Sequence, residues 1–566
     1  MVLFLAVVVI LGFIPASDNF LLQASINGVN LQRPKDLIPH ASKEVIRNIG
    51  YINGYKFFTT QYPFIRYTQN QLQSNKTPGE IGFFNALGDA DKQQIRIIHI
   101  GDSHLQADVY SGVVRNRLQG VFGNAGRGFV FPYRLVKSNS PGDYTSTAKG
   151  VWSFSRSTSA APVYDRGISG YTLVTDDEKA SFTINFRNPN GPSVGNRVRL
   201  LCDNSPTSFD VQIACSAIDT IFEYEASTNR TFPELVIDLP RNLGNSFTVS
   251  FSKTRAEQKR FKLYGIILEN TDSAGVLYQT MGVNGARIPN LTQSAAFPEH
   301  LRLLHPNLVI LDIGVNDYYP ANKLPGYVKD SLDRLVNMVA EFAPDATILL
   351  NSQQPNQYKK RNVPGCKPFS LLLNSLLDHP SGRVMLYDYF KVTDTKNAVK
   401  QWQNANLMQN DGIHLTHAGY RHKGELLSNA ILSGYQDYLK QSTSPLGYEL
   451  KGQIFASESD TTEATTEDSF EDNEEVIAVA GEADVTTVPE EEEEPKAKKA
   501  NPYRKTPGRY AKPQPTQYSY HTIVRGDNLG AIARKYRVTI TAIKKANNIK
   551  GTSITAGDKL KIPKMR

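Results

Sequence analysis

Residues 95–112 read IRIIHIGDSHLQADVYSG, and this stretch gives the first indication of the fold. A run of apolar, mostly β-branched residues ends at Gly101, Asp102 and Ser103, and helical spacing of apolar residues follows over 108–122. A strand that leads into a helix through a short turn is typical of an α/β sheet. The tripeptide alone does not separate a nucleophilic serine from a turn serine, because such triplets are common in loops.

The α/β pattern returns in the second half of the chain. HPNLVILDIG (305–314) and ATILLNS (346–352) predict buried strands, and VMLYDYF (384–390) indicates a further one. VKDSLDRLVNMVAEFA (328–343) predicts an amphipathic helix, and 416–439 predicts a closing helix. Strands that alternate with helices predict a mostly parallel sheet covered on both faces. In such sheets ligands bind at the carboxyl ends of the strands.

Between residues 140 and 272 the pattern changes to short strand-like runs, among them KASFTINFR, FDVQIACS and SFTVSFS. Glycine, proline, asparagine and aspartate separate these runs, and no helical stretch interrupts them. Regular short strands of this kind predict a β-sandwich or jelly roll. The fold class expected is therefore α/β with an inserted all-β module.

The whole chain divides into six predicted segments. They are a signal peptide or anchor (1–19), a mixed lead-in (20–94), a discontinuous α/β domain (95–139 and 273–440) and the β insertion (140–272). A disordered linker (441–518), acidic first and then Pro-rich and basic, leads to a small C-terminal domain (519–566).

The N-terminal segment and the charge distribution concern location and partners. VLFLAVVVILGFIPA (2–16) matches a signal-peptide core, although no positive region precedes it, so we expect export with the segment either cleaved or kept as an anchor. The net charge of +8 hides an asymmetry: residues 456–495 carry 16 acidic and no basic side chains, and 496–566 carry 18 basic side chains and two aspartates. No nucleic-acid motif accompanies the basic tail, so a nucleic-acid partner is not expected.

The three cysteines leave one question open. Cys202 and Cys215 lie in neighbouring strand-like runs. In an exported protein they either form a disulfide or are buried as two small apolar side chains. Cys366 is left over. No cysteine and histidine cluster has the spacing of a structural zinc site, so no metal is expected.

Candidate catalytic groups occur at the predicted strand ends. A serine becomes a strong nucleophile when a histidine takes its proton, an acid orients that histidine, and donors meet the oxyanion. Ser103 ends the first strand, Gly285 lies in TMGVNGARI (280–288), and Asn316 lies in IGVND (313–317) directly after a strand. Asp411 and His414 lie in NDGIHLTHAGY, just before the last helix.

These residues occur in four short blocks that resemble those of the SGNH hydrolases, also called GDSL esterases. The blocks are the GDS serine, a glycine, the G-x-N-D asparagine and D-x-x-H, in family order. The resemblance implies a three-layer α/β sandwich with a parallel sheet. It implies that Ser103 is the nucleophile, His414 the base and Asp411 its orienter. It also implies an oxyanion hole made by the backbone N–H groups of Ser103 and Gly285 and the side-chain amide of Asn316.

Neighbouring polar residues have other interpretations. His417 lies close to His414 on a helix, but only His414 fits D-x-x-H. His104 replaces the leucine of the GDSL name. Its side chain either lines the active-site pocket or packs beside it, and the sequence does not favour one role over the other. Asp102 and Asp317 are expected to have structural roles of the helix-capping kind.

The C-terminal stretch 520–563 predicts a β-α-α-β unit and resembles a LysM domain through GD-x-L-x-x-IA-x-x-Y and the ending AGDKLKIP. LysM domains bind glycans that contain N-acetylglucosamine, such as peptidoglycan and chitin. By that resemblance the candidate glycan-binding residues are Gly526, Asp527, Asn528, Leu529, Asn548 and Ile549. For Leu529, core packing is the alternative.

The order of the modules resembles peptidoglycan O-acetylesterases and acetyltransferases of Gram-negative bacteria, in which a β-sandwich interrupts the SGNH domain. This implies a periplasmic or envelope enzyme that removes acetyl groups from peptidoglycan sugars, at the muramic acid 6-hydroxyl, through an acetyl-enzyme on Ser103 and without a cofactor. Three alternatives remain: acetyl transfer to another sugar, deacetylation of another polysaccharide, or a non-catalytic wall protein. A membrane contact is expected only through an uncleaved N-terminal segment.

Overall fold

The computed structural model describes most of the chain between residues 61 and 440 and most of the C-terminal domain. The described ranges are 24–26, 29–31, 61–77, 80–187, 194–319, 323–440, 518–523, 529–536, 540–547 and 557–563, with single residues 538 and 549. The predicted signal segment lies outside them, as does the predicted linker except for Tyr518, where the first strand of the C-terminal domain begins. The chain forms two compact units, Met1–Thr465 and Thr466–Arg566.

The first unit is built on a six-stranded sheet that carries the predicted site. Its strand order is β16-β4-β17-β18-β21-β3, and every neighbouring pair is parallel except β21 with β3. The strands are β16 (Gly275–Gly282), β4 (Gln94–Gly101), β17 (Leu308–Asp312), β18 (Thr347–Asn351), β21 (Val384–Tyr387) and β3 (Leu72–Gln73). Residues of the predicted lead-in thus supply the edge strand β3.

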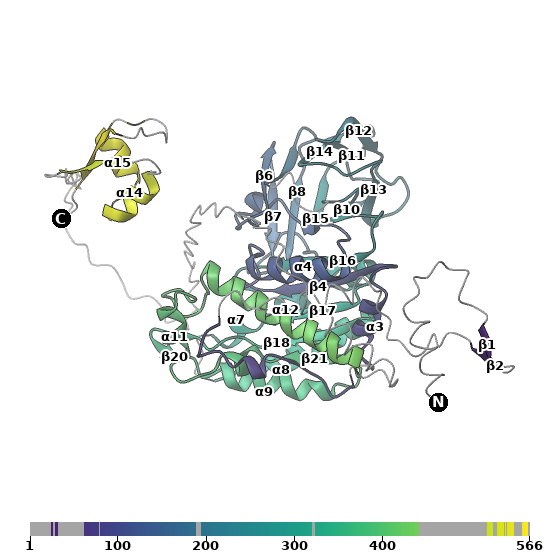
Figure 1. Ribbon diagram of the computed structural model, residues 1–566. Helices are drawn as coiled ribbons and strands as arrows, with labels where there is room; N and C mark the ends of the chain where they lie inside the picture. The colour runs from purple at the N-terminus through teal and green to yellow at the C-terminus, as the bar shows by residue number, and fades with distance from the viewer. Residues whose placement is uncertain are drawn as a thin grey trace, which may run out of the picture. The chain divides into compact units, whose positions relative to one another are not determined.

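Helices cover both faces of this sheet because its strands are apolar on both sides. In β4, Ile95 and Ile97 face one core, and Ile98 and Ile100 face the other. The first core is closed by α3 (Gly82–Gly88), α4 (Val109–Phe122) and α12 (His417–Lys440). The second is closed by α5 (Ile288–Thr292), α6 (Ala296–Leu304), α8 (Tyr327–Phe342) and α9 (Cys366–Ser375). Figure 1 shows α12 running across the sheet, and the three layers agree with the predicted α/β sandwich.

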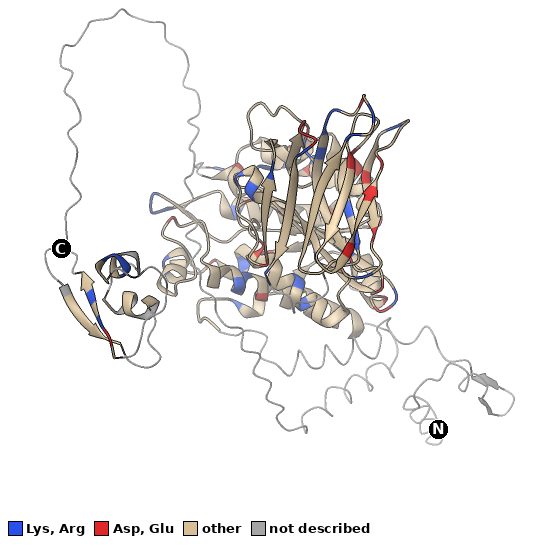
Figure 2. Ribbon diagram, turned by 90° about the horizontal axis from the view of Figure 1, so that it is seen from above, with Lys and Arg blue, Asp and Glu red and all other residues tan. Residues whose placement is uncertain are grey.

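The inserted β module consists of two antiparallel sheets that share an apolar core. One sheet has the order β13-β10-β15-β8-β7, with strands Phe232–Asp238, Arg197–Asn204, Phe261–Glu269, Tyr171–Thr175 and Ser153–Arg156. The other has the order β12-β11-β14-β9-β6, with strands Ile218–Tyr224, Asp210–Cys215, Ser246–Ser252, Ser181–Phe186 and Tyr144–Lys149. Figure 2 shows acidic and basic residues interspersed along these strands. The two sheets form the all-β module that the sequence predicts.

Buried polar contacts join the β module to the central sheet. Strand β5 (Gly128–Val130) comes from the α/β segment and pairs with β15 of the module. Glu269 at the end of β15 accepts hydrogen bonds from Arg96 of β4 at 2.9 Å and from Arg199 of β10 at 3.0 Å. Because Glu269 is buried, removing either arginine would leave this carboxylate less fully paired.

The three cysteines are free and buried. Cys202 lies in β10 and Cys215 in β11, so they belong to opposite sheets of the module. The sequence left open whether these two cysteines form a disulfide. In the structure they are instead two small buried side chains. Burial raises the pKa of the Cys215 thiol to about 11, which keeps it protonated near neutral pH.

The C-terminal unit has the predicted β-α-α-β order. Strands β22 (Tyr518–Thr522) and β23 (Lys559–Pro563) pair antiparallel, and helices α14 (Leu529–Tyr536) and α15 (Ile540–Asn547) lie between them in the chain. Its core contains Ile523, Leu529, Ile532, Ala533, Ile543, Leu560 and Ile562.

Short elements complete the description. They are β1 (Ala24–Ile26), β2 (Val29–Leu31), α7 (Val315–Tyr318), β19 (Gln357–Tyr358), β20 (Arg361–Asn362), α10 (Tyr389–Thr393), α11 (Ala398–Asn404) and the 3-10 turns Tyr67–Gln69, Tyr133–Val136 and Leu376–Asp378. Among the described residues, no helix is both long enough and apolar enough to cross a membrane.

Candidate active site

The serine of the first block lies where the central sheet ends. Strand β4 ends at Gly101, and Ser103 follows it in a turn at the carboxyl edge, partly open to solvent. A Cβ atom on Gly101 would lie 2.5 Å from the carbonyl oxygen of Asp312 at the end of β17. Glycine is therefore needed where these two strand ends approach each other, and the GDS motif has a packing reason as well as a chemical one.

A continuous chain of hydrogen bonds joins the three predicted catalytic side chains. Ser103 Oγ lies 2.9 Å from His414 Nε2, and His414 Nδ1 lies 2.7 Å from Asp411 Oδ2. If Nδ1 donates to the carboxylate, Nε2 is left to accept the serine proton, which is the arrangement a general base requires. The fold thus brings together residues separated by more than 300 positions.

Asp411 is held in place by its own turn. Its Oδ1 accepts the backbone N–H groups of Ile413 at 2.9 Å and His414 at 3.0 Å. Partial burial by itself would raise the pKa of Asp411, but the hydrogen bonds from His414 and Ile413 outweigh it and lower that pKa. The carboxylate consequently stays ionised and fixes the orientation of the imidazole. The D-x-x-H spacing places both groups within one turn.

The predicted oxyanion donors converge beside Ser103, but they differ in availability. Gly285 is exposed and has a φ of +75°, a left-handed conformation that favours glycine. Within the described part of the chain, the backbone N–H groups of Ser103 and Gly285 have no hydrogen-bond acceptor. The Asn316 amide instead donates to Ala286 O at 3.0 Å and to Asp102 Oδ2 at 3.3 Å. Both of its N–H groups are therefore engaged, and it can meet an oxyanion only by giving up one of these bonds.

Replacing Asn316 by alanine tests this donor. We expect kcat for ester hydrolysis to fall by about 10²- to 10³-fold, the usual effect of losing one oxyanion donor, with a much smaller change in KM. Steady-state kinetics with a chromogenic acetyl ester measures it, and Asn374→Ala on the exposed side of α9 is the control. An unchanged kcat would show that the two backbone N–H groups suffice.

Of the two aspartates expected to cap helices, Asp317 does so, whereas Asp102 stabilises a turn. Asp102 Oδ1 accepts the His104 N–H at 3.1 Å within the turn, and the side chain is fully buried. Asp317 accepts the N–H of Ile288 at 3.1 Å and so caps α5. Burial raises the pKa of Asp317 to about 6 and that of Asp102 to about 7.

The raised pKa of Asp102 predicts a pH-dependent stability. The native state keeps the Asp102 proton up to about pH 7, whereas the unfolded state loses it near pH 4, so stability due to this group falls as pH rises between these values and stays low above them. The variant Asp102→Asn has no ionisable group at this position, so it does not lose this stability as the pH rises. Between pH 4 and pH 8 the variant should gain up to about 4 kcal/mol in free energy of unfolding relative to the wild type.

Urea denaturation at the two pH values measures this difference. Both tryptophans of the chain, Trp152 and Trp402, lie in the first unit, so intrinsic fluorescence follows that unit alone. Equal differences at pH 4 and pH 8 would contradict the assignment.

The neighbouring histidines have clear positions. His104 is buried, its Nδ1 lies 3.0 Å from Tyr420 Oη, and its ring is 5.4 Å from the ring of His414. Burial, together with Lys423 and His414, lowers the pKa of His104 far below its ordinary value, so it stays neutral. His104 therefore packs beneath the base. His417 is exposed at the start of α12, and it is His414 that contacts Ser103.

A buried ion pair below the site escapes sequence reasoning. Lys423 of α12 and Asp312 of β17 are both fully buried, with Nζ 3.3 Å from Oδ2. Gln353 donates to the same carboxylate, and the rings of Tyr110 and Tyr389 lie 4.7 Å and 5.0 Å from Nζ. A lysine in an amphipathic helix pattern is ordinarily placed on the exposed face, so no sequence signal marks this one.

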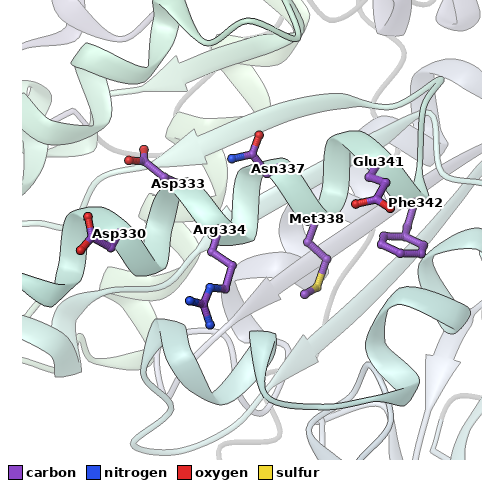
Figure 3. A pocket seen from close by; sticks show the side chains of 7 residues that line it. All are labelled: Asp330, Asp333, Arg334, Asn337, Met338, Glu341 and Phe342. Atoms are coloured by element: carbon purple, nitrogen blue, oxygen red, sulfur yellow. The ribbon is translucent and has the colours of Figure 1, made fainter.

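A surface groove of the first unit lies away from the four sequence blocks. The groove in Figure 3 lies along the outer face of α8, between Asp330 and Phe342, and contains none of the predicted catalytic residues. No group of three or more metal-ligating side chains occurs in the described part of the chain.

Of the predicted glycan-binding residues, Gly526, Asp527, Asn528 and Asn548 lie outside the described residues. Leu529 is buried and Ile549 packs against the same core, which favours packing over glycan contact.

Two segments of the chain match models of known protein families. Residues 243–422 match the family model described as GDSL-like lipase/acylhydrolase, and residues 521–563 match the LysM domain. The chain therefore contains a segment similar to the GDSL-like lipase/acylhydrolase family, followed by one similar to the LysM domain. No curated protein matches the sequence.

One solved structure shares its fold with 64% of this chain. It is described as "Peptidoglycan O-acetylesterase in action, 5 min" and is 19% identical with a TM-score of 0.54, and the match covers 64% of this chain and 99% of that one. A family two carbohydrate esterase from Cellvibrio japonicus is 12% identical with a TM-score of 0.22, over 52% of this chain and 99% of that one. At these identities the first likeness concerns the fold alone, and the second is too distant to support an argument.

Proposed function

We propose that this chain is an exported serine esterase that removes O-acetyl groups from peptidoglycan sugars and is held on the cell wall by its LysM domain. The observation that carries the proposal is the hydrogen-bonded chain from Ser103 through His414 to Asp411 in a protein that also carries a LysM domain. A shared fold with a structure described as a peptidoglycan O-acetylesterase supports the substrate class. A Gram-negative periplasm, and the muramic acid 6-hydroxyl as the acetylated position, are part of the proposal.

The proposed reaction has two steps that share one intermediate. Ser103 Oγ attacks the acetyl carbonyl carbon while His414 Nε2 takes the serine proton. The backbone N–H groups of Ser103 and Gly285 stabilise the oxyanion, and the Asn316 amide joins them by giving up one of its two acceptors. The C–O bond to the sugar then breaks, and His414 returns the proton to the departing sugar oxygen. This leaves an acetyl ester on Ser103 and a free sugar hydroxyl.

Water completes the cycle. His414 removes a proton from a water molecule as it attacks the acetyl-enzyme, and the returning Ser103 oxygen accepts that proton when acetate leaves. The protein itself supplies the nucleophile, the base and the oxyanion donors, so the residues present account for every proton. A sugar hydroxyl in place of water would give acetyl transfer.

The test is acetate release from O-acetylated peptidoglycan by the full-length protein. We expect free acetate with the wild type and none with Ser103→Ala, while both proteins sediment with insoluble peptidoglycan. Sedimentation without acetate release by the wild type would overturn the esterase and leave a glycan-binding protein. Acetate recovered on an added sugar instead of in solution would assign the protein as a transferase.

A further inference from the structure

One arginine of the β module is buried without a partner. Four arginines among the described residues are less than a tenth exposed, and three of them pair with carboxylates: Arg115 and Arg127 with Asp108, and Arg199 with Glu269. The fourth, Arg166, is only 8% exposed, and its guanidinium has neither an ion pair nor a hydrogen bond within the described part of the chain.

Asp165, the acidic residue next to Arg166 in the chain, makes no ion pair with it. Asp165 uses Oδ2 to accept the backbone N–H of Ala296 at 3.1 Å. A buried guanidinium is costly unless a carboxylate or another acceptor meets it. The guanidinium of Arg166 is therefore without an anionic partner among the described residues.

Arg166 belongs to the loop of the module that borders the candidate oxyanion hole. This loop, residues 157–170, connects β7 to β8. At its start, Thr158 Cγ2 lies 3.9 Å from the point a Cβ on Gly285 would occupy. At its end, a Cβ on Gly170 would lie 2.6 Å from Val283 Cγ2, so the loop packs directly against the residues that lead to Gly285.

The segment around Arg166 is anchored on the catalytic domain. Its carbonyl oxygen accepts the hydroxyl of Ser294, which follows α5. Two residues on, the N–H of Ile168 donates to Nδ1 of the buried His300 at 3.1 Å. Burial lowers the pKa of His300 to about 4, so Nδ1 remains an acceptor at neutral pH. The backbone that carries Arg166 is thus anchored at the junction of the module with α5 and α6.

We propose that Arg166 is a substrate-binding residue that receives a carboxylate of the glycan substrate on the module side of the active site. The inference rests on the proposed function, because peptidoglycan carries carboxylates on its peptides, whereas a small acetyl ester carries none. Arginine suits this ligand, since its planar fork binds a carboxylate through two parallel hydrogen bonds. A polymer extends far beyond its acetyl group and so can contact both Ser103 and Arg166.

The kinetic test compares two forms of one substrate. O-acetylated muropeptides are used as they are and after their carboxylates have been converted to amides. We expect wild-type kcat/KM to be about tenfold or more higher for the acidic form, which corresponds to one charge-assisted contact, and Arg166→Gln to reduce this preference to about one. Arg241→Gln, at an exposed position of the same module, should keep the wild-type preference. Equal wild-type rates for both forms would overturn the proposal.

Binding measurements keep this inference separate from the esterase activity. Calorimetry with Ser103→Ala, alone and combined with Arg166→Gln, compares Kd for the acidic and amidated muropeptides. A preference for the acidic form that disappears with Arg166 supports the site even if no acetate is released, whereas equal Kd values for both forms refute it. If the glutamine variant does not fold, Arg166→Lys replaces it, and it should keep part of the preference because it keeps the charge but not the fork.

Discussion

Ser103→Ala is expected to lower kcat for ester hydrolysis by about 10⁴- to 10⁶-fold, with the fold unchanged. The substitution removes the hydroxyl oxygen that lies 2.9 Å from His414 Nε2, in position to attack an acyl carbon. Binding of substrate through groups away from the serine remains, so KM should change far less than kcat. Hydrolysis of a chromogenic acetyl ester measures the effect.

Chemical labelling adds a second readout for the same residue. A fluorophosphonate reagent should label the wild type on Ser103, as located by peptide mapping, and should leave Ser103→Ala unlabelled. Ser375→Ala, which removes an exposed hydroxyl at the end of α9, is the matched control and should behave as the wild type in both assays. Retained hydrolysis or retained labelling in Ser103→Ala would transfer the role of nucleophile to another residue.

Lys423→Met is expected to lower the free energy of unfolding of the first unit by about 3–5 kcal/mol, because it leaves the buried Asp312 carboxylate without its cation. Burial by itself would raise the pKa of Asp312, but the charge of Lys423 and the contact with His99 outweigh it and keep that pKa below its ordinary value. Once the lysine is gone, the carboxylate either stays ionised without its cation or takes up a proton, and both alternatives cost stability. Urea denaturation followed by tryptophan fluorescence measures the loss.

Two further variants interpret the result. Lys329→Met removes an exposed lysine of α8 that pairs with Asp333 and should cause no measurable change. Lys423→Met combined with Asp312→Asn should recover part of the stability, because the uncompensated charge has been removed. A loss as large in the double variant as in the single one would mean that the lysine contributes through packing and not through the ion pair.

The chemistry of the candidate site was predictable because it depends on short motifs. GDS, G-x-N-D and D-x-x-H each place a functional group on a turn at the end of a strand, and parallel strands end on the same edge of the sheet. The sequence therefore predicted that Ser103, Asn316 and His414 lie near one another. It did not predict that both Asn316 N–H groups already have acceptors, because Ala286 and Asp102 reach the amide from other parts of the fold.

Sequence alone determined the class of fold, the order of the modules and the residue types available for catalysis, because hydrophobic periodicity and short motifs are local properties. Tertiary structure decided which charges are paired. Lys423 occurs in an ordinary helical pattern and Arg166 in an ordinary loop. Lys423 nevertheless pairs with Asp312 across the domain, whereas Arg166 pairs with no acid in the part of the chain that the structure describes. The cost of a buried charge depends on neighbours that are distant in the chain, so only the folded structure reveals it.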